Sequence, residues 1–340
     1  MKKICFFKFL LIILINLHFN QSFATQQTDS KNVNKQVNKE QNQTKCVFHF
    51  NKPSTQNTDN NCTEVKIGLE FSNLNYNMLT AADSVLRWAD SRGSGANIEL
   101  TQNLNQKYKF AFRFSRQNLK GGSMMDDDIQ NHGGIFSQSD SMSGNYTKIQ
   151  ALVFKKLDYQ FNPKLKSFFI FGLEQKKLNL YPTNGYQLTL GHNDIPANTY
   201  YLDKNTQTAK MLAKGLNIGL NYELELSNVN TIGLEIVAFL PLLIESSQHD
   251  WGYNNTNGFD WQMRLSGLKA LKNSRSYAIK IEEKHKINDN YWLSVYVFSE
   301  VMKINNPYEI DRKNNKVVRT YKSQNIEFFN FGIGTSLSIK

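Results

Sequence analysis

The chain of 340 residues carries 40 Lys and Arg against 29 Asp and Glu, which gives a formal net charge of +11 at pH 7. The basic residues are spread along the chain without a clustered basic and aromatic motif, so the positive charge does not predict nucleic-acid binding. Hydrophobic residues make up 40% and aromatic residues 12%, a composition typical of chains whose strands alternate between two environments.

The N-terminus has the features of a secretory signal peptide. Lys2 and Lys3 precede a mostly apolar run over residues 4–19, and residues 22–24 (Ser-Phe-Ala) offer a small-x-small cleavage site. We therefore predict that residues 1–24 are a cleaved signal peptide. After them we find no run of about 20 apolar residues, so we expect no transmembrane helix.

A polar leader over residues 25–61 is predicted to follow the signal peptide. Its first half has no aromatic residue and cannot bury enough apolar surface to fold, so we expect disorder. Cys46 and Cys62 are the cysteines that remain after signal cleavage, and in an oxidising compartment they form one disulfide most simply. Two cysteines are too few ligands for a zinc ion, so we predict no metal site.

Residues 62–340 are predicted to form an antiparallel β-barrel. Residues 64–71 alternate strictly between apolar and polar side chains, as half-buried strands do. About ten strand-length segments share this pattern: 64–71, 98–100, 108–115, 149–154, 168–180, 216–226, 232–243, 277–287, 291–301 and 326–339. We see no convincing helix between them.

The connections between these segments are alternately short and long. The short turns lie near residues 103–106, 162–164, 227–228 and 288–290, and the long polar loops span residues 116–146, 182–208, 246–258 and 303–324. In outer-membrane barrels, short turns face the periplasm and long loops face outside. We therefore predict an all-β, up-and-down transmembrane barrel of about ten strands. A soluble periplasmic β-sandwich remains the alternative.

Two of the long loops carry candidate chemistry. Residues 121–128 read Gly-Gly-Ser-Met-Met-Asp-Asp-Asp, and residues 244–253 contain His249 and Asp250. Carboxylates on one wall of a cleft and a His/Asp pair on the other would hold and deprotonate a water molecule, which is general-base chemistry. The alternative for three adjacent acidic residues is a solvated loop.

These residues resemble a known family, the omptins, which are outer-membrane endopeptidases of Gram-negative bacteria. Residues 86–88 (Leu-Arg-Trp) are similar to the family's L-x-W segment, and residues 121–128 are similar to its G-G-N-M-V-D-x-D motif. Residues 213–220 and 244–247 lie where the family has the strand that leads into its second catalytic loop. The resemblance runs in order over residues 64–340 and implies a ten-stranded barrel that cleaves peptides at basic residues.

The resemblance also implies catalytic residues. Asp126 and Asp128 match the family's water-binding Asp pair, and Asp250 matches the Asp of its Asp/His dyad. Gly252 stands at the position of the family's catalytic histidine, so His249 is the candidate replacement. The resemblance thus implies an omptin-type endopeptidase whose histidine does not stand at the family position. The alternative is a non-catalytic surface barrel: an adhesin, a small pore, or a degenerate omptin that binds host proteins.

Omptins need lipopolysaccharide, and the resemblance implies a phosphate-binding site on the outer barrel wall. Lys176 and Lys177 lie where the family has part of this site. The alternative is ordinary charge near a strand end. The expected partners are outer-membrane lipid, lipopolysaccharide, and a peptide or host-protein substrate, and we expect the protein to be a monomer that requires no other cofactor.

Overall fold

The computed structural model describes residues 63–79, 85–127, 135–158, 162–189, 198–202, 207–250, 259–305, 308–313, 316–322 and 325–339. The predicted signal peptide and leader, with Cys46 and Cys62, lie outside these residues. All of the strands below belong to one compact unit, Thr44–Lys340.

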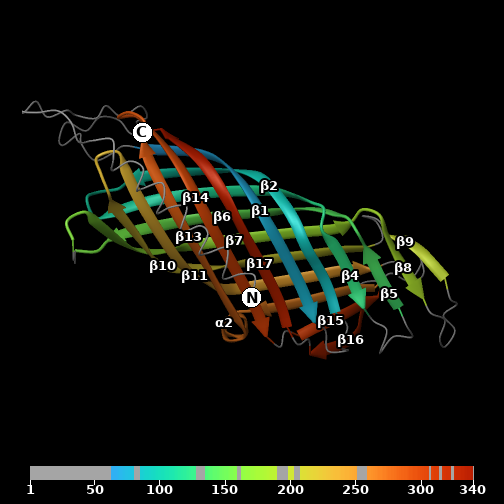
Figure 1. The fold of residues 1–340 in the computed structure, drawn as a ribbon. Coiled ribbons are helices and arrows are strands. Elements are labelled where there is room, and N and C mark those ends of the chain that lie inside the picture. Colours follow the sequence, from blue (N-terminus) through green and yellow to red (C-terminus); the bar gives the residue numbers. More distant parts are fainter. Residues whose placement is uncertain are drawn as a thin grey trace, which may run out of the picture. The chain divides into compact units, whose positions relative to one another are not determined.

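Ten long antiparallel strands form a closed barrel (Figure 1). They are β1 Thr63–Leu79, β2 Val85–Asn103, β3 Tyr108–Lys120, β6 Met142–Lys156, β7 Leu165–Pro182, β10 Gln207–Glu225, β11 Asn230–Asp250, β13 Ser274–Lys286, β14 Tyr291–Asn305 and β17 Asn325–Ile339. Each strand pairs with the next one in this order, and β17 also pairs with β1, which closes the wall. The predicted barrel is confirmed. Among the described residues, no helix is long and apolar enough to span a membrane.

The two ends of the barrel differ. One end carries the short turns, and the other end, which we call the mouth, carries additional short strands (Figure 1). These strands are β4 Ser123–Asp127, β5 Ile135–Ser139, β8 Gly185–Thr189, β9 Asn198–Leu202, β12 Phe259–Ser266, β15 Tyr308–Lys313 and β16 Lys316–Lys322. All of these strands except β12 lie in regions that we predicted to be long polar loops. That prediction was wrong for the strand residues, because the backbone there continues the pairing of the wall.

The side chains of β1 show why the barrel has two halves. In its first half, large apolar side chains face outward and are each more than half exposed: Ile67 54%, Leu69 54% and Phe71 55%. Further along the strand, apolar side chains occupy the inner face instead: Leu74 0%, Tyr76 1% and Met78 6% exposed. The alternation therefore reverses near Phe71. An outward apolar band of this kind fits the hydrocarbon core of a bilayer, and the part beyond it fits water.

On the neighbouring strands β7 and β10, the outer face changes from apolar to polar side chains at one level. Leu173 of β7 is 61% exposed and pairs with Leu216 of β10, which is 38% exposed. Two residues further toward the mouth, Gln175 pairs with Lys214 on the same outer face. The upper edge of the apolar band thus runs between these two pairs.

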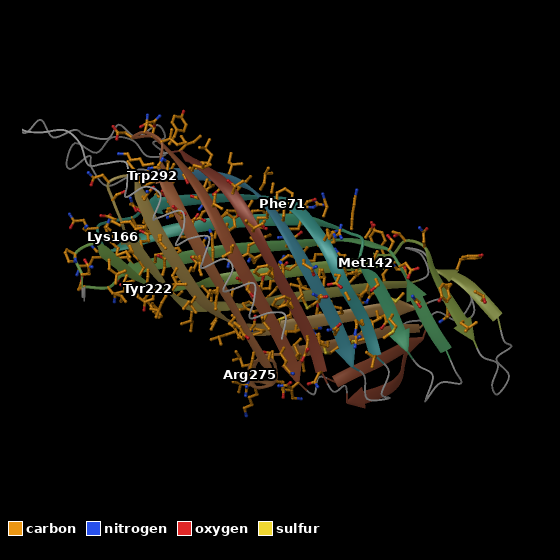
Figure 2. The ribbon with its side chains drawn as sticks, in the orientation of Figure 1. Phe71, Met142, Lys166, Tyr222, Arg275 and Trp292 are labelled. Atoms are coloured by element: carbon orange, nitrogen blue, oxygen red, sulfur yellow. The ribbon has the colours of Figure 1, made fainter. Side chains whose placement is uncertain are left out.

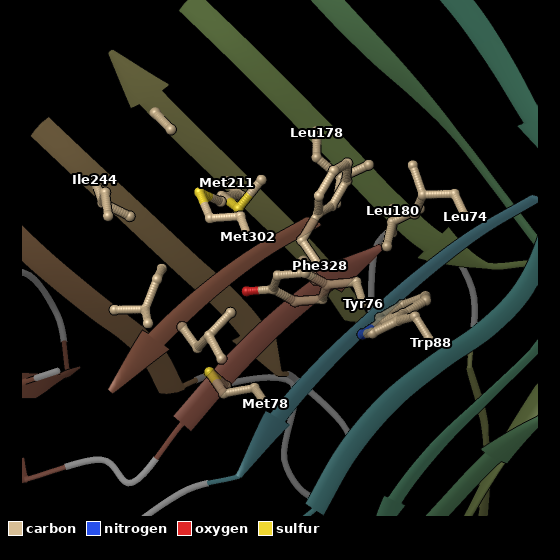
Figure 3. Packing of buried hydrophobic residues seen from close by; sticks show 14 of the residues in the cluster. Leu74, Tyr76, Met78, Trp88, Leu178, Leu180, Met211, Ile244, Met302 and Phe328 are labelled. Carbon is tan, nitrogen blue, oxygen red and sulfur yellow. The ribbon is translucent and has the colours of Figure 1, made fainter. Parts of the chain in front are cut away.

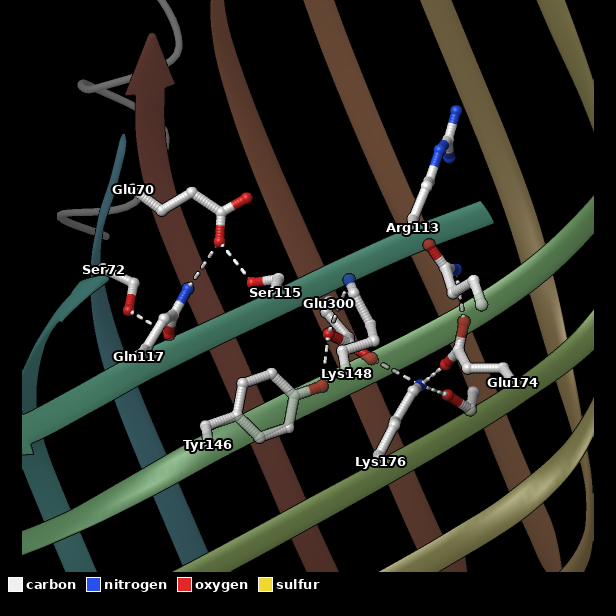
Figure 4. Close-up of polar contacts among 12 residues, drawn as sticks. Glu70, Ser72, Arg113, Ser115, Gln117, Tyr146, Lys148, Glu174, Lys176 and Glu300 are labelled. Carbon is white, nitrogen blue, oxygen red and sulfur yellow. Dashed lines mark hydrogen bonds and ion pairs between the residues drawn. The ribbon is translucent and has the colours of Figure 1, made fainter. Parts of the chain in front are cut away.

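The interior of the banded half is ionic (Figure 4). Arg113 donates to Glu235 at 2.7 Å (Nη1 to Oε1), across the lumen from β3 to β11. Lys176 lies between two carboxylates, Glu174 at 2.8 Å (Nζ to Oε1) and Glu300. Buried charges are tolerated when they are paired in this way, because an unpaired one has lost its hydration without compensation.

Above the ionic residues, the mouth is filled by an apolar cluster (Figure 3). The aromatic rings of Tyr76, Trp88 and Phe328 lie together at 1% exposure or less. Methionines from six strands complete the packing: Met78, Met124, Met142, Met211, Met263 and Met302. This cluster is the hydrophobic core of the part of the barrel that stands beyond the apolar band.

We predict that Lys176→Met lowers the free energy of unfolding by about 3–5 kcal/mol, because it leaves the Glu174 and Glu300 carboxylates buried without their shared cation. Lys177→Met is the matched control, since its exposed side chain lies on the outer face. Urea unfolding of the refolded protein in detergent measures both. Equal loss in the two variants would contradict the interior role of Lys176.

Candidate functional site

A glycine pair directs the chain from the wall into the mouth. Gly121 and Gly122 follow β3 and precede β4, and both have positive φ (71° and 77°). Strand β2 pairs with β3 over Arg92–Asn103 and with β4 over Val85–Ala89. The two glycines therefore lie where the partner of β2 changes from β3 to β4. A Cβ on Gly122 would lie 2.2 Å from the carbonyl oxygen of Ala89, whereas one on Gly121 meets nothing within 4 Å.

Asp126 of β4 faces β11 across the mouth. Its side chain is 6% exposed, and Gln248 of β11 donates from Nε2 to Asp126 Oδ2 at 3.1 Å. On the same face of β11, the Ser246 hydroxyl lies 2.7 Å from the hydroxyl of Tyr76. The structure therefore brings together the two segments that the sequence analysis selected, the acidic motif and the region just before His249.

The remaining predicted catalytic residues are described only in part. His249 and Asp250 are the last residues of β11, where His249 pairs with Thr208 and Asp260 through the backbone. Their side chains lie outside the description, as do Asp128 and Gly252 altogether. The position of Asp126 is thus known, and the His/Asp half of the predicted site stays a prediction.

The surroundings of Asp126 are both apolar and polar, because the buried Leu86 pairs with it from β2 and the buried Ser137 pairs with it from β5. Met124 lies two residues earlier on the same face of β4 and is fully buried, and it pairs with the fully buried Trp88. At the mouth, Asp126 is the one buried carboxylate in the part of the chain that the structure describes. A carboxylate that is shielded from bulk water attracts a cation or a polarised water more strongly than an exposed one.

Sequence reasoning missed Gln248. It lies in the second candidate loop, but glutamine carries no catalytic signal of its own, and its partner is 122 residues away. The sequence signal that could have identified Gln248 was its spacing from Asp250. Gln248 lies two residues before Asp250, and the period of two puts such residues on one strand face.

Lys176 and Lys177 lie on opposite faces of β7. Lys176 is 1% exposed inside the barrel, so it does not fit the predicted role on the outer wall. Lys177 is exposed on that wall. It lines a hollow, here called the outer basic groove, together with Lys210, Lys214, Glu245, Gln262 and Arg264. Arg264 and Glu245 form an exposed ion pair there at 3.3 Å (Nε to Oε1), so the remaining charge of the groove is positive.

The interior holds two small polar cavities. Their volumes are about 90 and 70 Å³, and both are lined by Arg113, Glu235 and other members of the ion pairs. The Arg113 and Glu235 pair spans the space between opposite walls. The chain's own charged side chains therefore occupy the lumen below the mouth.

No family model and no curated protein sequence matches the chain. Among solved structures, it is similar to the outer membrane protease OmpT of Escherichia coli, with 15% identity, a TM-score of 0.64, and coverage of 83% of this chain and 97% of that one. The toluene transporter TodX of P. putida matches with 10% identity and a TM-score of 0.25, covering 82% of this chain and 90% of that one. Ail of Yersinia pestis matches with 8% identity and a TM-score of 0.26, covering 81% of this chain and 98% of that one.

The likeness to OmpT establishes the fold of an outer-membrane β-barrel and no more, because the identity is low. Membership in the omptin family stays a prediction.

We predict that Gly122→Ala disrupts the β2 and β4 pairing while Gly121→Ala does not. Both variants force an alanine into positive φ, at about 1–2 kcal/mol. The clash with Ala89 adds about 1–3 kcal/mol at position 122 alone. Thermal unfolding and protease susceptibility of the mouth measure the difference, and equal effects in the two variants would contradict the close approach.

Proposed function

We propose that the protein is exported to the Gram-negative outer membrane and acts as an omptin-type endopeptidase at its mouth. The contact between Asp126 and Gln248 is the observation that carries this proposal, because it joins the acidic motif on β4 to the end of β11. The OmpT-like fold supports the same arrangement. The resemblance of the motifs implies that the substrates are peptides cut at basic residues.

In the proposed mechanism, Asp126 and Asp128 hold a water molecule over the scissile peptide carbonyl. Gln248 orients the Asp126 carboxylate by donating a hydrogen bond from its side-chain amide. His249, supported by Asp250, takes a proton from the water as general base, and the resulting hydroxide attacks the carbonyl carbon. The leaving amine then receives the proton from the imidazolium.

We predict that the purified protein in lipopolysaccharide-containing vesicles cleaves a mixed peptide pool. Asp126→Asn should lower kcat/KM by about 100-fold or more, because it removes a group that positions the water. Asp140→Asn is the control, since Asp140 is exposed and accepts a hydrogen bond from Gln138. Cleavage at the wild-type rate by the Asp126→Asn variant would contradict the proposed site.

A second candidate is a non-catalytic surface barrel that binds host proteins through its mouth. Gly252 at the family's histidine position favours it. If only the Gly252→His variant cleaves peptides, the wild-type chain is a decayed enzyme. If neither the wild type nor this variant cleaves peptides, the endopeptidase proposal fails and the non-catalytic surface barrel remains.

We also propose that the outer basic groove binds the phosphates of lipopolysaccharide. Lys177, Lys210 and Lys214 lie just above the apolar band, where the headgroups of an outer leaflet would lie. Lysine ammonium groups bind phosphate oxygens through charge-assisted hydrogen bonds. Lys176, which faces inward, takes no part in this site.

We predict that Lys210→Gln combined with Lys214→Gln reduces the lipopolysaccharide that copurifies with the protein and the thermal stabilisation on adding it. The effect should weaken with salt, as exposed electrostatic interactions do. Lys164→Gln is the control, because Lys164 is exposed in a short turn at the opposite end of the barrel. An unchanged lipopolysaccharide content in the double variant would refute this site.

A further inference from the structure

A short helix interrupts the wall beside β11. Strand β11 pairs with β12 over Leu243–Asp250 and with β13 over Asn230–Ala238. Between these two stretches the neighbouring chain forms α2, Leu268–Asn273. The amide of Gly267, just before the helix, donates to the carbonyl oxygen of Leu242 at 2.8 Å.

This connection sets the height of α2 on the barrel. Leu242 is exposed, and Leu243 pairs with Lys214 of β10, which lies just above the apolar band. Tyr277 on β13 is 51% exposed on the other side of the helix, toward the short-turn end. The helix therefore sits at the upper edge of the apolar band, on the outer surface.

The helix α2 has one buried side chain against the wall, one exposed apolar side chain and a basic residue in its last turn. Ala270 is fully buried against the wall, whereas Leu268 is 72% exposed. Lys272 lies in the last turn of the helix, and Arg275 follows on β13, pointing away from the barrel (Figure 2). An exposed leucine next to basic residues at the edge of an apolar band is the pattern of elements that lie in a membrane interface.

We propose that α2 is an interfacial anchor in the outer leaflet. Leu268 lies among the acyl chains near their headgroup end, and Lys272 and Arg275 bind the phosphates of the lipid headgroups. Long basic side chains reach the headgroup layer from such positions, and tyrosine favours the same layer, where Tyr277 lies. The proposal rests on the proposed outer-membrane location, and it uses residues separate from the outer basic groove.

The anchor acts on the mouth through β12. Gly267 joins α2 directly to this strand, which pairs through Trp261, Asp260 and Phe259 with the last three residues of β11. A lipid contact at α2 therefore holds the end of β12 that adjoins the helix, and β12 pairs with the part of β11 that ends at the candidate site. In this way the anchor sets the height of the mouth above the lipid surface.

Depth-dependent fluorescence quenching tests the anchor. The Leu268→Trp variant is reconstituted into phosphatidylcholine and phosphatidylglycerol vesicles whose acyl chains are brominated near the headgroup. We expect the emission gained over the wild type to be strongly quenched by bromine and shielded from acrylamide. Tyr201→Trp is the control on β9 at the mouth, where the residue is 88% exposed, and the opposite pattern is expected.

The charges are tested in the same assay. Adding Lys272→Gln and Arg275→Gln to Leu268→Trp should reduce bromine quenching in the phosphatidylglycerol vesicles, and pure phosphatidylcholine vesicles should show a smaller change. Full acrylamide access without bromine quenching at position 268 would overturn the anchor. So would chemical crosslinking of 268 to a second copy of the chain, because that result makes the helix a subunit contact. Neither result bears on peptide cleavage, so the two proposals fail separately.

Discussion

The wall strands that run from the apolar band into the mouth, such as β1 and β7, pass through two surroundings and change their apolar face on the way. On β1 the apolar side chains stand at odd positions up to Phe71 and at even positions from Leu74 onward. Because strand side chains alternate with a period of two, the reversal needs only a shift of the apolar residues by one position, without any break in the strand. This one constraint sets the level of the barrel in a bilayer and divides its interior into an ionic half and an apolar half.

The two halves support each other. The ion pairs cross the lumen, from Arg113 on β3 to Glu235 on β11 and from Lys176 on β7 to Glu300 on β14, so they link walls that share no backbone hydrogen bonds. The apolar cluster then packs above this base, and Tyr146 joins the two layers. Its hydroxyl donates to Glu300 at 2.9 Å while its ring lies 5.3 Å from that of Phe328.

The sequence predicted the strands well inside the apolar band and poorly above it, where the apolar side chains change to the inner face. Residues 64–71 showed clear alternation and were correctly predicted as strand. Residues 116–120 were read as loop, because above the band the outward positions are polar and only Leu119 marks the inner face. Lys176 was placed on the wrong face, although counting by twos from the outward Leu173 puts it inside. The Asp126 and Gln248 contact was beyond reach, because it depends on barrel radius and register.

Asp126 is a buried carboxyl group at the mouth that accepts a hydrogen bond from an amide, and water activation and cation binding both use such a group. What separates a peptidase from a passive barrel is the group that faces this carboxylate from the end of β11. The side chain of Gln248 faces inward. In the sequence, Asp250 and Gly252 follow it at even spacing, which is the spacing of residues on one strand face. His249 has the other parity. His249 can act as the proposed general base only if the backbone departs from strict alternation where β11 ends, whereas Asp250 has the parity of Gln248 and needs no such departure.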